Sequence, residues 1–565
     1  MPESPSLASQ IGLKINGADV DSDVMGNVLS VEVDQHAHLP GMFVIRLQDP
    51  GFSLIDEGPF DLTKEVEISA QKEDGHKNGG QWITLIKGEV TGLEPEFQEG
   101  MIARLVVRGY DKSHRLYRDQ KTKAHLNAKD SDLATAIAQS ADLQAEVDTT
   151  TTVYDHILQH NQSDLTFIQE RAWRIGYECF VDEGKLIFRK PLGPGQPITL
   201  TWGADLLSFS PRMTLAEQVS EVVVRAWSVE QKDAIVGRAE EGALYPDIRE
   251  EKNGAAWAAA FGAAKRIYLD QSTVSQAEAN MLAEARLNEL SGAFVQAEGV
   301  ALRRPDIRAG KRITLEALGE RFSGTYLVTN ARHTYTAEGL KTCFSVRGAR
   351  TGQIIDDMGL RPTQERLPGA MVGLVTNTDD PENWGRVKVE FPWMADSAES
   401  DWARVMGIGA GPDAGFYVIP EVGDEVLVVF EQGDIRRPFV VGGLWNGIDA
   451  PPPIAPSGAG ERPLARSWYS RTGHHITVYD NSDNKIEIVT QGGHKIILDD
   501  ANREVKLTTS GGLVLTLADS GGKITLEGNE ISVKANGSLK IESGANMDLQ
   551  AGGQMTIKGA VVNLN

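Results

Sequence analysis

Pairs of apolar residues two positions apart recur every eight residues near the C-terminal end of the chain. Both members of a pair fall on one face of an extended backbone, and a turn of Gly, Asn, Ser or Ala follows each pair. The pairs are Ile531 and Val533, Leu539 and Ile541, Met547 and Leu549, and Met555 and Ile557. Strands this short cannot enclose a core in one chain. The pattern therefore predicts a rod in which copies of the chain wrap around an axis and bury these side chains.

The same pattern extends upstream with a looser spacing of nine to ten residues. Its pairs are Ile476 and Val478, Ile486 and Ile488, Ile496 and Leu498, Val505 and Leu507, Leu515 and Leu517, and Ile524 and Leu526. Gly-Gly steps between pairs supply sharp turns, because glycine has no Cβ to clash there. Charged positions such as Lys540 and Asp548 alternate with the apolar ones and predict a solvated outer face. We therefore expect a needle over residues 451–565.

The last apolar residues of the chain are Val561, Val562 and Leu564. A blunt apolar tip with unpaired strand ends favours aggregation unless something covers it. Two interpretations stay open: these residues contact a small tip protein, or they only complete the core of the rod.

Residues 10–110 alternate between apolar and polar positions, as half-buried strands do. Asn16-Gly17 lies between two such runs and is a strong signal for a two-residue hairpin. The pattern predicts about six or seven strands, and we expect them to form a first β-barrel over residues 1–120.

The periodicity becomes helical after residue 130. One helix is expected to begin at Asp130 or Ser131 and to carry apolar residues as far as Leu143, and Ser163 can cap a second helix that Gly176 ends. A hairpin follows. Together these elements predict an α/β insert over residues 121–204.

Alternation returns in residues 205–355 and predicts a second barrel. A polar, alanine-rich stretch near 231–265 interrupts it, and a helix from about Ser275 to Leu290 pierces it. After a polar linker near 351–367, five short strands joined by glycine and proline turns predict a small OB-fold barrel over residues 356–450. The fold class is therefore mainly β: two barrels with an α/β insert, an OB barrel, and a C-terminal intertwined β-helix or β-prism needle.

Composition narrows the range of partners. The net charge of −23 argues against binding to a nucleic-acid backbone and favours other proteins as partners, since a trimer would carry −69, three times that charge. Cys179 and Cys343 lie in apolar runs and are expected to be buried free thiols. The start of the chain lacks the pattern of a signal peptide, and no apolar run reaches the length of a membrane span. We expect synthesis in the cytoplasm.

The OB segment resembles that of VgrG (valine-glycine repeat G) and phage central-spike proteins. The resemblance rests on DPENWGRVKVEFPW at 380–393, GFYVIPEVGDEVLVVF at 415–430 and GGLWNG at 442–447, and on SDLTFI at 163–168 in the insert. The compact N-terminal part is more similar to the spikes of extracellular phage-tail-like particles than to the longer spikes of type VI secretion.

The resemblance implies a homotrimeric central spike in a contractile injection machine. The two barrels of each chain would form a baseplate hub of six similar units in the trimer, below the tail tube. The needle would puncture a membrane and carry a PAAR-like tip protein. Further partners implied are the tail tube protein and baseplate hub and wedge proteins, with transient contact to a target membrane, in an assembled particle that can be released outside the cell.

Two alternative functions are a type VI secretion spike and a tail-associated cell-wall or glycan hydrolase. The 18-residue segment 447–464 is too short for a catalytic domain, and the chain carries no HExxH, GxSxG, Walker or CxxC motif. His36 and His38 have HxH spacing but lie far from the needle, so we expect a structural role for them. We predict no enzyme activity, no catalytic residue, no cofactor and no metal site.

Overall fold

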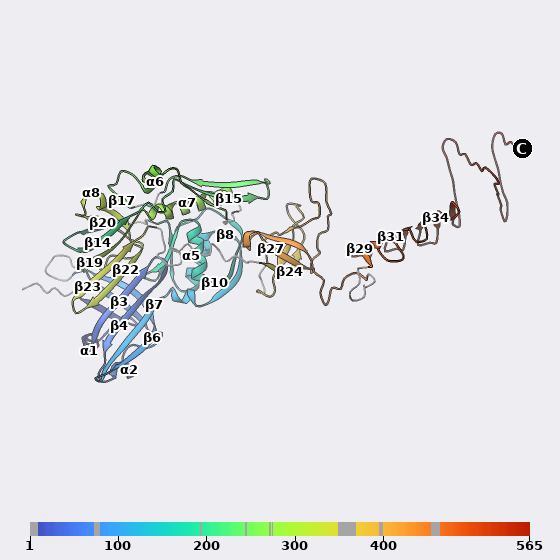
Figure 1. The fold of residues 1–565 in the computed structure, drawn as a ribbon. Helices are drawn as coiled ribbons and strands as arrows, with labels where there is room; N and C mark the ends of the chain where they lie inside the picture. The colour runs from blue at the N-terminus through green and yellow to red at the C-terminus, as the bar shows by residue number, and fades with distance from the viewer. Residues whose placement is uncertain are drawn as a thin grey trace, which may run out of the picture. The chain divides into compact units, whose positions relative to one another are not determined.

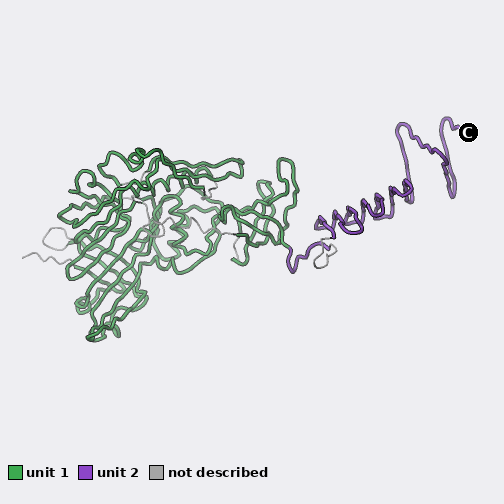
Figure 2. The backbone as a smooth tube through the Cα atoms, viewed as in Figure 1, with its two compact units in different colours: residues 1–444 green, residues 445–565 purple. Residues whose placement is uncertain are grey.

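The chain forms two compact units, residues 1–444 and 445–565 (Figure 2). The fold is mainly β, with a few helices gathered in the first unit (Figure 1). The computed structural model describes residues 10–72, 80–191, 195–242, 246–269, 273, 275–348, 369–394, 399–453 and 464–564. The predicted linker near 351–367 lies outside these residues.

One sheet of 11 strands runs through both predicted hub barrels. Its order is β14 (Leu206–Met213), β19 (Val295–Leu302), β23 (Gly339–Val346), β22 (Asn330–Thr336), β3 (Val28–His36), β4 (Leu39–Gln48), β7 (Ile102–Asp111), β6 (Trp82–Gln98), β5 (Glu65–Gln71), β1 (Ile11–Ile15) and β2 (Ala18–Asp19). Strands β22 and β3 pair antiparallel, with Ala331 opposite Gln35. The two hub parts, which lie within residues 1–120 and 205–355, therefore share a backbone ladder, and the apolar core of the first also contains Leu340 of β23.

The hairpin predicted at Asn16-Gly17 is confirmed. Asn16 and Gly17 have φ values of 50° and 81°, and they join β1 to β2. Two consecutive positive φ values match the right-handed twist of paired strands, and Asn-Gly tolerates them. Short helices border the first hub part: α1 (Ser22–Gly26), α2 (Ser53–Asp56) and α3 (His114–Tyr117).

The insert contains both predicted helices and the hairpin. Its elements are β8 (Gln120–Ala128), α4 (Asp130–Ser140), β9 (Gln144–Val147), β10 (Tyr154–Ser163), α5 (Asp164–Arg174), β11 (Glu178–Asp182) and β12 (Lys185–Arg189). Ser163 caps α5 as predicted, because its Oγ accepts the Thr166 N–H at 3.2 Å. Helix α4 ends at Ser140, so Leu143 lies beyond it.

The second hub part contains the predicted helix as α7 (Gln276–Gly292), capped by Ser275. The stretch near 231–265 was expected to break the strands, yet it contains β16 (Asp233–Ala239) and α6 (Gly254–Ala258). Strand β16 forms because it pairs with β15 (Glu221–Ser228) and packs on α7. The remaining elements are β13 (Ile198–Thr201), β17 (Asp247–Ile248), η1 (Ala259–Phe261), β18 (Lys265–Tyr268), β20 (Arg312–Glu316), α8 (Gly319–Phe322) and β21 (Gly324–Leu327).

The two cysteines differ in exposure. Cys179 is buried, as predicted, whereas the prediction for Cys343 was wrong, because that side chain is exposed. Strand β23 alternates between its two faces, and Cys343 falls on the open one.

The OB segment forms the five predicted strands. They are β24 (Ala370–Asn377), β25 (Lys388–Glu390), β26 (Arg404–Val405), β27 (Glu425–Phe430) and β28 (Pro438–Gly443), with η2 (Glu431–Gly433) between the last two. The sheet order is β25-β24-β27-β28-β26, and its two edge strands meet where Val387 and Ala403 exchange backbone hydrogen bonds of 2.9 and 2.7 Å. The segment is therefore a closed small barrel around an apolar core.

Asp380 fixes the turn that leads into β25. Its buried carboxylate accepts the backbone N–H groups of Glu382, Trp384 and Arg386 at 3.1, 2.8 and 3.1 Å, and the Arg386 guanidinium at 2.6 Å. Hydrogen bonds from Arg386 hold the pKa of Asp380 well below its usual range. This network explains why Asp and Arg stand together in the DPENWGR turn.

The second unit begins with a meander of seven five-residue strands. They are β29 (Ala465–Tyr469), β30 (His475–Tyr479), β31 (Lys485–Val489), β32 (Lys495–Asp499), β33 (Glu504–Thr508), β34 (Val514–Ala518) and β35 (Lys523–Glu527). Gly493 and Gly512 turn the chain between strands with φ values of 89° and 83°. The strands predicted upstream of residue 528 are thus confirmed.

Candidate assembly surfaces

One face of the meander from β30 to β35 is apolar along its whole length. The second and fourth residues of each strand are the predicted apolar pairs, and the register sets each pair directly opposite the next. Ile476 faces Ile488, for example, and Ile488 faces Ile496 on its other side. Side chains directly opposite on paired strands contact one another, so the pairs form two continuous apolar columns.

These columns are open to solvent within one chain. From β30 to β32 their six side chains are 37 to 42% exposed, and Ile524 in β35 reaches 71%. The opposite face carries mostly polar residues such as Thr477, Glu487, Lys506 and Thr516. A one-sided apolar sheet of this length is typical of an interface with another polypeptide.

The eight residues predicted as the needle core lie beyond β35 and are not brought together in the single chain. They are 47 to 71% exposed, and no strand forms within the described residues 528–564. The three-residue strands predicted there do not form in an isolated chain, because such a strand has no backbone neighbour to pair with. Val561, Val562 and Leu564 are likewise exposed.

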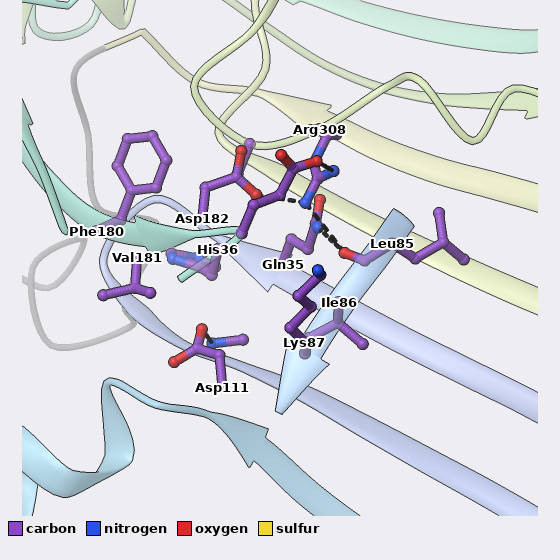
Figure 3. Close-up of a pocket in the computed structure, with 13 residues that line it drawn as sticks. Gln35, His36, Leu85, Ile86, Lys87, Asp111, Phe180, Val181, Asp182 and Arg308 are labelled. Carbon is purple, nitrogen blue, oxygen red and sulfur yellow. Dashed lines mark hydrogen bonds and ion pairs between the residues drawn. The ribbon is translucent and has the colours of Figure 1, made fainter. Parts of the chain in front are cut away.

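Arg308 joins three parts of the hub at a small pocket (Figure 3). Its guanidinium donates to the carbonyl oxygens of Thr84 at 2.5 Å and Leu85 at 3.1 Å, both in β6. It also donates to Glu183 at 2.8 Å and to the Asp182 carboxylate, in the β11–β12 hairpin of the insert. Arg308 itself comes from the second hub part and is 5% exposed. One buried cation thus ties the first hub part, the insert and the second hub part together.

Other polar groups that line this pocket also form hydrogen bonds with the protein itself. The buried Asp111 carboxylate accepts the Gly41 N–H at 2.6 Å and the Ser113 N–H at 2.8 Å, and burial raises its pKa to about 6. Burial lowers the pKa of His36, whose Nδ1 accepts the His38 N–H at 3.1 Å. These contacts join segments of the protein to one another, such as Gly41 and Asp111, which are 70 positions apart.

His333 packs close to Arg308, and its environment predicts an acid-sensitive hub. Burial, and after it the charge of Arg308, lower the pKa of His333 from 6.5 to about 3, against an opposing effect of Asp306. Below pH 6.5 the unfolded chain therefore binds a proton at His333 that the folded chain does not bind. The free energy of unfolding should fall as pH drops from 6.5 towards 3, by at most about 1.4 kcal/mol per pH unit. His333→Gln should flatten this part of the profile of unfolding free energy against pH, measured by denaturant titration.

His494→Gln is the matched control, since His494 is exposed in the other unit. A profile for His333→Gln that keeps the full acid slope would contradict the assignment.

Sequence reasoning did not single out Arg308. Arg308 stands in the charged segment RRPDIRAGKR at 303–312, where nothing in the local sequence sets it apart from its neighbours. The partners of Arg308 are more than a hundred positions away, so no local pattern identifies them.

The described residues contain no group of three or more His, Cys, Asp or Glu side chains placed to hold a metal ion. Over the same part of the chain, none of the helices is long and apolar enough to cross a membrane.

Two family models match the chain. The Alg8 N-terminal domain matches residues 8–337, and the type VI secretion system/phage-baseplate injector OB domain matches residues 371–445. The first match covers the hub and insert, and the second coincides with the five-stranded barrel.

Individual relatives match shorter stretches. The type VI secretion system spike protein VgrG2a of Pseudomonas aeruginosa is 32% identical over 118 residues, which are 19% of this chain and 14% of that protein. The actin cross-linking toxin VgrG1 of Vibrio cholerae is 28% identical over 131 residues, 22% of this chain and 12% of that protein. The matched region thus spans about one seventh or less of each of these relatives.

The fold resembles that of a solved Francisella structure, a PdpA-VgrG complex in its half-lidded form. The TM-score is 0.50 at 9% identity, covering 92% of this chain and 88% of that chain. Because the model of the Alg8 N-terminal domain matches more than half of the sequence, the chain belongs to that family, and with its injector OB domain it is a VgrG-like spike protein.

Proposed function

We propose that this protein is the structural central spike of a contractile, phage-tail-like injection machine. In this proposal it acts as a homotrimer that joins the tail tube and baseplate hub to a membrane-puncturing needle. The observation that carries the proposal is the unbroken apolar face of β30 to β35, which continues in the eight-residue repeat. None of the described residues covers that face, and copies of the chain would offer the matching surface.

A shared core suits a needle under axial load. Three identical faces turned to one axis would bury the columns on all sides, and backbone groups of the short repeats could pair between chains. Burying an Ile or Leu contributes about 1.5 to 3 kcal/mol, so many repeats together can offset the cost of ordering the backbone. The needle core would comprise the eight side chains from Ile531 to Ile557, in a trimeric β-prism.

The parts of the chain receive distinct roles in this proposal. Residues 1–120 and 205–355 are two hub barrels that would face the tail tube and baseplate hub and wedge proteins, with the insert at 121–204. The OB domain at 356–450 would lead into the needle at 451–565. Val561, Val562 and Leu564 would contact a PAAR-like tip protein, and the needle would meet the target membrane only transiently.

The second candidate is a spike of type VI secretion, which the names of the matched Pseudomonas relatives favour. Particles recovered from culture medium with sheath and tube would support the extracellular machine, whereas retention in intact cells would support type VI secretion. The hydrolase alternative has less support, because none of the similar proteins reported above is named as a hydrolase.

The mass of the purified full-length protein tests the proposal first. The expected value is about 184 kDa, three times the chain mass of 61.4 kDa, by light scattering after size exclusion. The trimer should persist on dilution, because a needle core shared by three chains cannot separate without exposing its apolar columns. A monomer that is ordered through its C-terminal repeats would overturn the proposal.

A further inference from the structure

A single buried carboxylate lies where the insert, the second hub part and the OB domain meet. Glu278, in the first turn of α7, accepts Arg174 Nη2 of α5 at 2.6 Å. It also accepts Arg436 Nη1, from the OB domain, at 3.2 Å. The side chains of all three residues are only 4 to 7% exposed.

Further contacts fix the positions of Glu278 and Arg436. Ser275 caps α7 by accepting the Glu278 N–H at 3.2 Å, which holds the first turn of the helix. Arg436 also donates to Asp434, with Nη2 at 2.8 Å, and the Asp434 carboxylate accepts the Arg436 backbone N–H at 3.0 Å. Buried charges are tolerated only when paired and hydrogen-bonded, and these contacts supply that pairing.

Contacts at two other places hold the OB domain against the hub. Arg437 donates to the carbonyl oxygens of Thr273 and Trp227, both at 3.0 Å. His156 of β10 makes a 2.8 Å hydrogen bond with the carbonyl oxygen of Glu399, and Leu158 of the same strand packs against the OB core. The OB domain is thus held by α5 and α7, by the end of β15, and by β10.

We propose that Glu278, shared by Arg174 and Arg436, is a rigid joint that fixes the orientation of the OB domain on the hub. Hydrogen bonds to charged groups are directional, so the buried triad restrains rotation more than an apolar contact of equal area would. Arg308 ties the three hub parts in the same manner. The hub and OB domain would then move as one body. That this body transmits axial force rests on the proposed function, whereas the joint itself does not.

Distances between two spin labels test the joint in the full-length protein. Nitroxides are placed on Ala136→Cys in α4 and Thr378→Cys in the OB domain, both exposed positions, with Cys343→Ser to remove the exposed native thiol. Co-expression with an excess of chain that lacks the two added cysteines leaves most of the labelled assemblies with a single labelled chain. We expect a narrow distance distribution, and a roughly twofold broader one in Glu278→Gln and Arg436→Met, since loss of one partner leaves a buried charge unpaired.

Lys341→Gln is the control, because it breaks an exposed ion pair with Glu338 far from the joint, and it should leave the distribution narrow. Arg436→Lys keeps the charge but loses the fork geometry, and it serves where the stronger variants fail to fold. A broad distribution in the parent protein, or an unchanged width in every folded joint variant, would overturn the proposal. Both outcomes are independent of whether the protein acts as a spike.

Discussion

Replacing Ile541 and Leu549 together with Asp is expected to abolish SDS-resistant and heat-resistant trimers. Both side chains are predicted to point into the shared needle core, and in the single chain they are 70 and 71% exposed. The double variant would lose about 3 to 6 kcal/mol of apolar burial per chain. It would also place six carboxylates around one axis, where each buried charge costs several kcal/mol. Gel electrophoresis without boiling and light scattering after heating measure the loss.

The matched control changes charge on neighbouring outward positions. Lys540→Asp with Asp548→Lys keeps the net charge and should leave the trimer resistant, because alternate residues of a strand point to opposite faces. If Ile541→Asp with Leu549→Asp assembles normally while the control does not, the two faces have been assigned the wrong way round.

Removal of Arg308 should produce the second large effect, a loss of about 3 to 5 kcal/mol in the stability of the hub. Arg308→Met retains much of the side-chain volume but removes the Arg308 donor from Asp182, from the Thr84 carbonyl oxygen and from that of Leu85, which keeps the 2.5 Å hydrogen bond from Gln35 Nε2. Breaking a buried pair by removing one partner is costly, since the remaining charge stays desolvated. Denaturant unfolding of the full-length protein measures the change in the hub transition.

Arg332→Met provides the comparison for an exposed arginine. Arg332 pairs with Glu32 and Asp34 across β22 and β3, but its side chain is 52% exposed, so its loss should cost at most about 1 kcal/mol. Equal effects of the two substitutions would show that the Arg308 contacts contribute no more than a surface pair.

Local features of the fold were predictable where one residue type has a specific structural effect. Asn16-Gly17 specifies a hairpin, and Ser163 and Ser275 specify helix starts, because these effects act over two to four positions. Strand β16 was missed because it depends on pairing with β15 and packing on α7 rather than on its own composition. The pairing of β22 with β3 joins residues about 300 positions apart, which no local pattern encodes.

The candidate assembly surface was predictable in its pattern and not in its final form. Periodicity alone identified both members of each apolar pair, and the register of β30 to β35 places pair against pair. The residues from Ile531 onward remain predictions, because the partners that would order them are other molecules. The buried arginine joints went unnoticed because their chemistry depends on which distant segments meet.

The open apolar face of the second unit also has a consequence for how the protein is made. In the proposed trimer, a newly made chain would expose this apolar face until further copies of the chain bind. The time before they bind grows as the local concentration of the chain falls. Neighbouring ribosomes on one mRNA would shorten this time, because they release copies of the chain close together. Slow, dilute expression should therefore lengthen the time for which this open face is exposed to other proteins of the cell.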